Sequence, residues 1–181
     1  GASSHRLAYE QVAELMSVFD LTMPAKLKRD LFAHLFPGDG DEHGAVIGCG
    51  LVETSRGMRL LARELMVAED GVDYVPGKAG YRMLTAQFVM KCGQRCRDSG
   101  LAYLAVHNHG GETSVGFSGD DMASHVRGYP ALVDILGGPP VGALVFAKRA
   151  VAGDLWLSDG SRRVLREGRV IGAQVERLYP S

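Results

Sequence analysis

The sequence predicts an α/β domain in which helices flank a mixed central β-sheet. Apolar runs of strand length alternate with segments whose apolar residues recur at helical spacing. Their order is helix, β-hairpin, helix, strand, loop, helix and β-hairpin. The 181 residues suit one domain, and 46% of them are apolar, which is enough to form a buried core.

A helical segment is expected at about 8–36, ahead of the first strand. Its apolar residues recur at helical spacing on both sides of Pro24, which favours a second helix that opens at this proline. These residues are Val12, Leu15, Met16, Phe19, Leu27, Leu31, Phe32 and Leu35. The run Pro-Gly-Asp-Gly at 37–40 ends the segment.

The remaining elements follow from apolar runs and from glycine and proline. Strands are predicted at 42–48, 59–67, 101–106, 141–147 and 151–157, with a further strand around 163–171. Helices are predicted at 84–97 and at about 119–127, the second ended by Gly128 and Pro130. Residues 69–80 are expected to form a loop. One domain at 5–175 is expected, because residues 1–4 are typical of a cloning remnant.

Charge and apolar runs narrow the classes of function. The chain has 20 basic and 21 acidic residues, so its balance indicates no nucleic acid partner. No apolar run approaches the roughly 20 residues that a membrane helix needs, so no membrane partner is expected. Three cysteines favour a reducing compartment, with the cytoplasm as the default. Cys92 and Cys96 could form a redox or metal pair, or simply be buried thiols on one helix face.

Two histidines follow a buried strand and indicate a metal site. Because side chains alternate along a strand, His107 and His109 leave the same face of the sheet. Asp121, at the start of the next helix, can add a carboxylate oxygen. Two nitrogens, one carboxylate and an open position are the layout of a catalytic zinc site. An ordinary hydrogen-bonded histidine pair remains open, and Ser118-x-x-Asp121 is also a helix N-cap signature.

The combination resembles the motif of JAMM (MPN or JAB) zinc metalloproteases: a Glu before an early strand, His-x-His, then Ser-x-x-Asp. Glu42 precedes such a strand, whereas its acidic neighbour Glu53 lies beyond the far end. Eight residues, 110–117, separate the second histidine from the serine, one more than is usual in the family. The resemblance covers about 28–157. The stretches 107–111, 116–118, 127–131 and 152–156 look closest to bacterial JAB domains associated with ubiquitin-like conjugation operons.

The resemblance implies a single JAB/MPN domain with a cytidine-deaminase-like sheet and one Zn²⁺ per chain. His107, His109 and Asp121 would bind the metal. Glu42 would act as the general base, and the Ser118 hydroxyl would stabilise the oxyanion. Among nearby residues, His125 is a weaker ligand candidate, Asp120 could support the ligands or the helix start, and His43 points to the opposite strand face.

The implied activity is the removal or processing of a ubiquitin-like modifier. The substrate would be a ubiquitin-like protein or its conjugate, and activating-like and conjugating-like enzymes of the same operon could be partners. Residues 69–82 occupy the place where relatives grip the modifier's tail. Two alternatives stay open: a JAMM peptidase acting on a small sulfur-carrier or peptide conjugate, and a non-catalytic MPN scaffold. The complete residue set argues against the scaffold.

Overall fold

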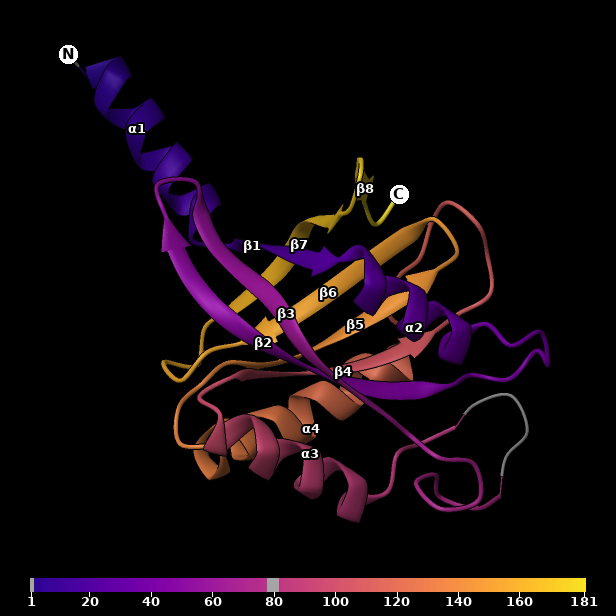
Figure 1. The fold of residues 1–181 in the computed structure, drawn as a ribbon. Coiled ribbons are helices and arrows are strands. Elements are labelled where there is room, and N and C mark those ends of the chain that lie inside the picture. The colour runs from indigo at the N-terminus through magenta and orange to yellow at the C-terminus, as the bar shows by residue number, and fades with distance from the viewer. Residues whose placement is uncertain (1, 78–81) are drawn as a thin grey trace.

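The computed structural model describes residues 2–77 and 82–181, and its sheet closes into a barrel (Figure 1). The strand order is β1-β3-β2-β4-β5-β6-β7-β8, with a further pairing between β1 and β7. The first seven strands of this order therefore form a closed mixed barrel, and β8 extends the sheet beyond β7. The elements are α1 (Ala2–Leu15), β1 (Val18–Pro24), α2 (Ala25–Leu35), β2 (Gly44–Thr54), β3 (Gly57–Val67), α3 (Ala86–Asp98), β4 (Ala102–Asn108), α4 (Gly119–Ile135), β5 (Val141–Ala147), β6 (Ala150–Trp156), β7 (Arg162–Ile171) and β8 (Val175–Leu178).

The prediction of a JAB/MPN α/β fold, with helices flanking a central sheet, is wrong. The finding that overturns it is the parallel pairing of Val18–Pro24 with β7, which closes the ring. Helical spacing around Phe19 predicts a helix here, but Phe19, Leu21 and Met23 also alternate along the chain and are fully buried. Pairing with β3 on one side and β7 on the other satisfies the backbone of β1, and tertiary context overrides the local pattern.

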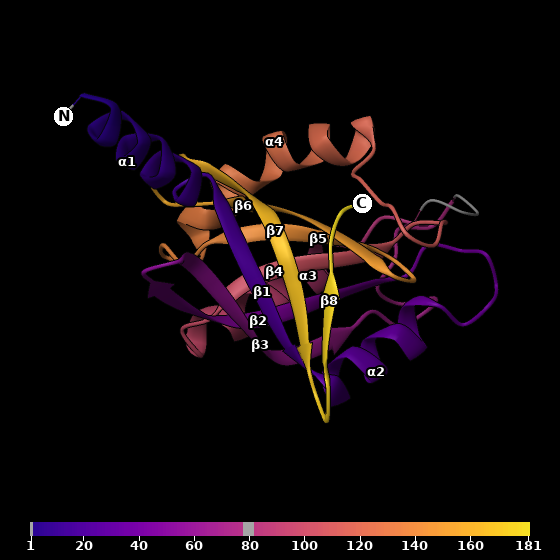
Figure 2. The same cartoon turned by 90° about the horizontal axis from the view of Figure 1, so that it is seen from above.

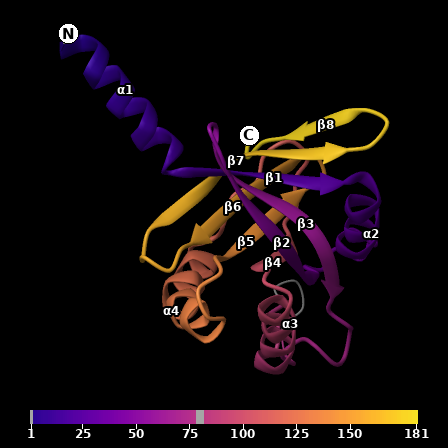
Figure 3. The same ribbon diagram turned by 60° about the vertical axis from the view of Figure 1, so that its left-hand side comes forward.

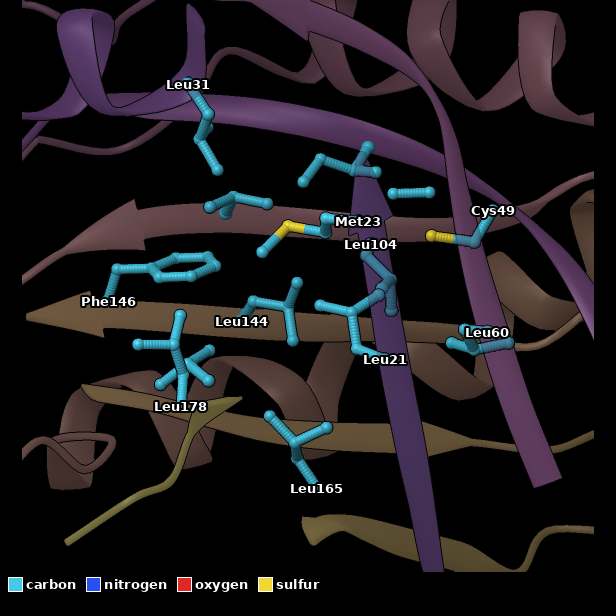
Figure 4. Packing of buried hydrophobic residues seen from close by; sticks show 14 of the residues in the cluster. Leu21, Met23, Leu31, Cys49, Leu60, Leu104, Leu144, Phe146, Leu165 and Leu178 are labelled. Carbon is cyan, nitrogen blue, oxygen red and sulfur yellow. The ribbon is translucent and has the colours of Figure 1, made fainter. Parts of the chain in front are cut away.

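The interior of the barrel holds the larger core cluster (Figure 4). Alternate side chains of the strands meet there, among them Leu21, Leu60, Leu104 and Leu144. The helix α2 lies near one end of β1 and β3 (Figure 3) and adds its buried residues Leu31 and Leu35 to the cluster. Pro24 is the N-cap of α2, in agreement with the expected helix start at this proline.

A second cluster lies between the barrel and two helices on its outside. In Figures 1 and 3, α3 and α4 cover the same outer side, over β2, β4 and β5. Cys92 and Cys96 are buried in this cluster as free thiols, which is the simpler of the two interpretations of that pair. By contrast, α1 projects away from the barrel (Figures 1 and 2), with exposed apolar residues along it.

Besides β1, the sequence prediction differs from the structure at the end of α4, at the end of β2 and at β8. Strand β2 was expected to end near residue 48 but runs to Thr54, so Glu53 lies within it. The helix expected to end near residue 127 continues through Gly128 and Pro130 to Ile135, because Leu132 and Val133 are buried on its inner face. That burial outweighs the hydrogen bond that a proline cannot donate. Strand β8 was not predicted, whereas β3, β5, β6 and β7 lie close to their predicted ranges. None of the helices in the described part of the chain has the length and apolar character that a membrane crossing requires.

Candidate metal centre

His107 in strand β4 and His109, directly after the strand, lie on the outer side of the barrel, toward α4. The alternation of β4 sends Leu104 and Val106 into the barrel interior and Tyr103 and Ala105 into the outer cluster. The imidazoles follow the outward set. Their Nε2 atoms lie 3.1 Å apart, and the two rings meet edge to face at 4.8 Å between centroids.

The start of α4 brings Asp121 to the histidine pair. Ser118 is the N-cap, and its hydroxyl oxygen accepts a hydrogen bond from the Asp121 backbone N–H at 3.1 Å. Asp121 is at the third helical position and makes the reciprocal contact, in which its Oδ2 accepts a hydrogen bond from the backbone N–H of Ser118 at 2.7 Å. This capping box holds the carboxylate at the helix end. Oδ2 lies 3.5 Å from Nε2 of His107 and 3.5 Å from Nε2 of His109.

These three donors fit a zinc ion. Bonds of about 2.0–2.1 Å in a tetrahedral arrangement put neighbouring donor atoms about 3.3 Å apart. The observed separations are 3.1, 3.5 and 3.5 Å. Two imidazole nitrogens and one carboxylate also match the donor chemistry of zinc hydrolases, which leave a fourth position open. Within the described part of the chain, His107, His109 and Asp121 form the cluster that could hold a metal ion.

Glu42 lies beside this cluster because of the register between β2 and β4. Gly44 pairs with His107, so Glu42, two residues earlier, lies level with His109. Its Oε1 is 3.5 Å from Nε2 of His109. Burial raises the pKa of Glu42, and attraction to the two histidines partly offsets that rise. A carboxylate with a raised pKa next to a metal site suits a general base.

Two contacts orient these groups, and neither was predicted from the sequence. The Nδ1 of His109 lies 3.1 Å from the carbonyl oxygen of Gly116, so this nitrogen carries the proton and Nε2 is left free to bind metal. Asn108 points to the opposite side of the strand. Its Oδ1 accepts from the His43 backbone N–H at 2.7 Å, which ties the segment that carries Glu42 to β4. An amide between two candidate ligands was the signal available in the sequence.

The charge of Asp121 is stabilised. Burial raises its pKa, but hydrogen bonding and attraction to His107, together with hydrogen bonds from Ser118, outweigh burial and hold the pKa far below its ordinary value. The side chain of Asp121 is 8% exposed, against 20% for His107 and 21% for His109. The cluster therefore combines the buried, negatively charged carboxylate of Asp121 with two partly exposed imidazoles.

The other predicted residues lie as follows. Ser118 caps α4 by accepting from the Asp121 backbone N–H, and its own hydroxyl hydrogen is donated to Oδ2 of Asp121 at 2.8 Å. His43 contacts Asp39 through Nε2 at 2.8 Å rather than the metal ligands. The Nδ1 of His125 is held by Asp154 at 2.9 Å, and Asp120 is exposed at the helix start. Of the loop assigned to modifier binding, residues 78–81 lie outside the described residues.

Comparisons with known proteins do not assign the chain to a family. No protein-family model matches it, and no curated protein matches it. Among solved structures, it is similar to the solution structure of protein DSY2949 from Desulfitobacterium hafniense, a structural genomics target. The TM-score is 0.48 and the identity 14%, over 80% of this chain and 90% of that one. A likeness at this level carries no functional argument, so the function is argued from the site alone.

Proposed function

We propose that the protein is a zinc-dependent hydrolase that cleaves an amide bond, with His107, His109 and Asp121 as ligands. The observation that supports this most strongly is the convergence of three donor atoms at 3.1–3.5 Å, with a carboxylate of Glu42 3.5 Å from one of them. When bound, zinc supplies a Lewis acid that polarises a carbonyl and activates water near neutral pH.

The protein's own groups divide the remaining work. Glu42 takes the proton of the attacking water and returns it to the leaving amine, so the same carboxylate acts as base and then as acid. His109 is kept in the required tautomer by the Gly116 carbonyl. The Ser118 hydroxyl, at the edge of the site, is the proposed donor to the developing oxyanion, for which its one hydrogen would turn away from Oδ2 of Asp121.

The substrate class follows from the motif alone. We propose a ubiquitin-like protein or its conjugate, as the resemblance to the JAMM motif implies, with activating-like and conjugating-like enzymes as partners. A small sulfur-carrier or peptide conjugate would use the same chemistry. The non-catalytic scaffold is the non-enzyme alternative, and the intact donor set together with Glu42 speaks against it. Three buried free thiols agree with a reducing compartment such as the cytoplasm.

Metal analysis followed by a cleavage assay tests the proposal. The purified chain should contain about one zinc ion and should cleave fusions of ubiquitin-like proteins or small amide conjugates. Chelation should abolish turnover, and added Zn²⁺ should restore it. A chain that binds no zinc, or zinc-loaded protein that is inert toward both substrate panels, would favour the scaffold.

A further inference from the structure

A half-open cavity of about 240 Å³ adjoins the candidate metal centre. Glu42, His107 and Asp121 line part of its wall, so a molecule bound at the metal would also face the cavity. Most of the other lining residues are apolar and come from the barrel strands, from the two covering helices and from residues 82–84, while Arg82, Ser124 and His125 add polar groups.

Two small residues on adjacent strands create this space. Ala105 of β4 pairs directly with Ala143 of β5, and both line the cavity. One pair further along the same face, Tyr103 lies beside Val141, and both are buried in the outer cluster. The large side chains of Tyr103 and Val141 therefore fill the space under the helices, whereas the Ala105–Ala143 pair, which is nearer to His107, leaves it open.

The helices and a neighbouring segment close the sides. Val89 comes from α3, and Tyr129 and Leu132 come from one face of α4. Leu84 lies against Gly44, where a Cβ would approach its Cδ2 to 2.8 Å. Because Gly44 has no side chain, Leu84 can pack close to β2 and still line the cavity.

We propose that this cavity binds a bulky apolar group next to the scissile amide, such as a leucine or phenylalanine side chain. The inference rests on the proposed hydrolase and adds the substrate's side chain to it. An apolar cavity of about 150 Å³ is large enough to hold benzene, so the present cavity has room for one large side chain. A glycine next to the bond, as in the Gly-Gly tail of a ubiquitin-like protein, would leave the apolar wall in contact with water. Of the two proposed substrate classes, the cavity therefore favours the peptide conjugate.

Alkyl hydroxamic acids test the cavity without requiring turnover. Their head group binds zinc, and the chain length can be varied from acetohydroxamic acid upward. Titration calorimetry on zinc-loaded Glu42→Gln protein should show affinity rising about fourfold per methylene until the cavity is filled. Ala105→Leu should remove this dependence and leave the affinity for acetohydroxamic acid unchanged. Ala8→Leu on the exposed face of α1 is the matched control and should behave as the parent protein.

The outcomes separate this inference from the proposed function. Affinity independent of chain length in zinc-loaded protein, or dependence that persists in Ala105→Leu, overturns the cavity assignment and leaves the hydrolase in place. Absence of zinc binding overturns both. With the active chain, amides that carry leucine next to the bond should be cleaved at least about tenfold more efficiently than glycine analogues. Equal cleavage would also overturn the assignment.

Discussion

Gly44 lies directly opposite His107 in the antiparallel pairing of β2 with β4. This register determines the composition of the site, since a shift by one residue would turn Glu42 to the other face of the sheet. The same glycine makes room for Leu84. One pair of residues thus sets the position of the proposed base and the shape of the neighbouring cavity.

Glu42→Gln should abolish amide cleavage and leave zinc bound. Loss of a general base typically lowers the rate by about 10²–10⁴, whereas the glutamine amide preserves the size of the side chain. Turnover and zinc content should be measured on the same preparation. Glu53→Gln, on the exposed part of β2, is the control and should retain full activity. An active Glu42→Gln enzyme would assign the base to another residue.

His109→Ala should lose both zinc and activity. The histidine contributes one of three donor atoms, and its Nε2 lies 3.5 Å from Oδ2 of Asp121. Zinc affinity should be measured by competition with a chelator of known strength. Loss of a residue that only supports a ligand typically lowers metal affinity about 10- to 100-fold, so loss of a ligand should lower it at least that much. His5→Ala on exposed α1 should not change the affinity. Unchanged affinity in His109→Ala would remove His109 from the ligand set.

The strands with clear apolar runs could be predicted from the sequence, and the closure of the sheet could not. Apolar runs at 59–67, 141–147 and 151–157 each lie close to an observed strand. Val18–Pro24 fits both a helical and an alternating pattern, and only its two strand partners decide between them. Those partners are distant in the chain: Phe19 pairs with Met58 and with Leu165. Local patterns carry no information about such pairings.

The candidate site was more accessible to sequence reasoning than the fold. Strand alternation alone places His107 and His109 on one face, and the N-cap signature accounts for how Asp121 is held. The supporting contacts were not predictable, because the Gly116 carbonyl is a backbone group and the role of Asn108 depends on the β2–β4 register. These groups become meaningful only once the chain segments are placed side by side.

The three cysteines should resist modification while the protein is folded. Burial raises the pKa of Cys92 to about 12 and of Cys96 to about 11, and it raises that of Cys49 as well. The reactive thiolate is therefore scarce at neutral pH. A thiol reagent at pH 8 should react with all three only after unfolding in guanidinium. Rapid labelling of the native protein, or a disulfide between Cys92 and Cys96, would contradict their assignment as core residues.

Acid should destabilise the protein partly through Asp154. Burial raises the pKa of this carboxyl, but hydrogen bonds from His125 and Arg162 outweigh it and lower the pKa below the ordinary 3.8. A pKa that is lower in the folded state stabilises the fold above about pH 4, and this contribution is lost as the pH falls through the folded value. Asp154→Asn should cost roughly 1.5–3 kcal/mol at pH 7. Its free energy of unfolding should also fall less between pH 5 and pH 2 than that of the parent. Parallel pH profiles would exclude the contribution.

Ser118→Ala separates the two roles assigned to Ser118. Because Ser118 is the N-cap of α4, its truncation to alanine should lower the protein's folding stability by about 0.5–2 kcal/mol. If Ser118 also donates to the oxyanion, the variant's kcat should fall by about 10²–10³. Thr85→Ala is the matched control, because Thr85 caps α3 through a hydrogen bond from the Phe88 N–H but does not line the metal cluster. It should lose comparable stability with kcat unchanged. If Ser118→Ala loses stability but keeps its kcat under conditions where it is fully folded, Ser118 is a cap alone, and the oxyanion is stabilised by the other groups of the site.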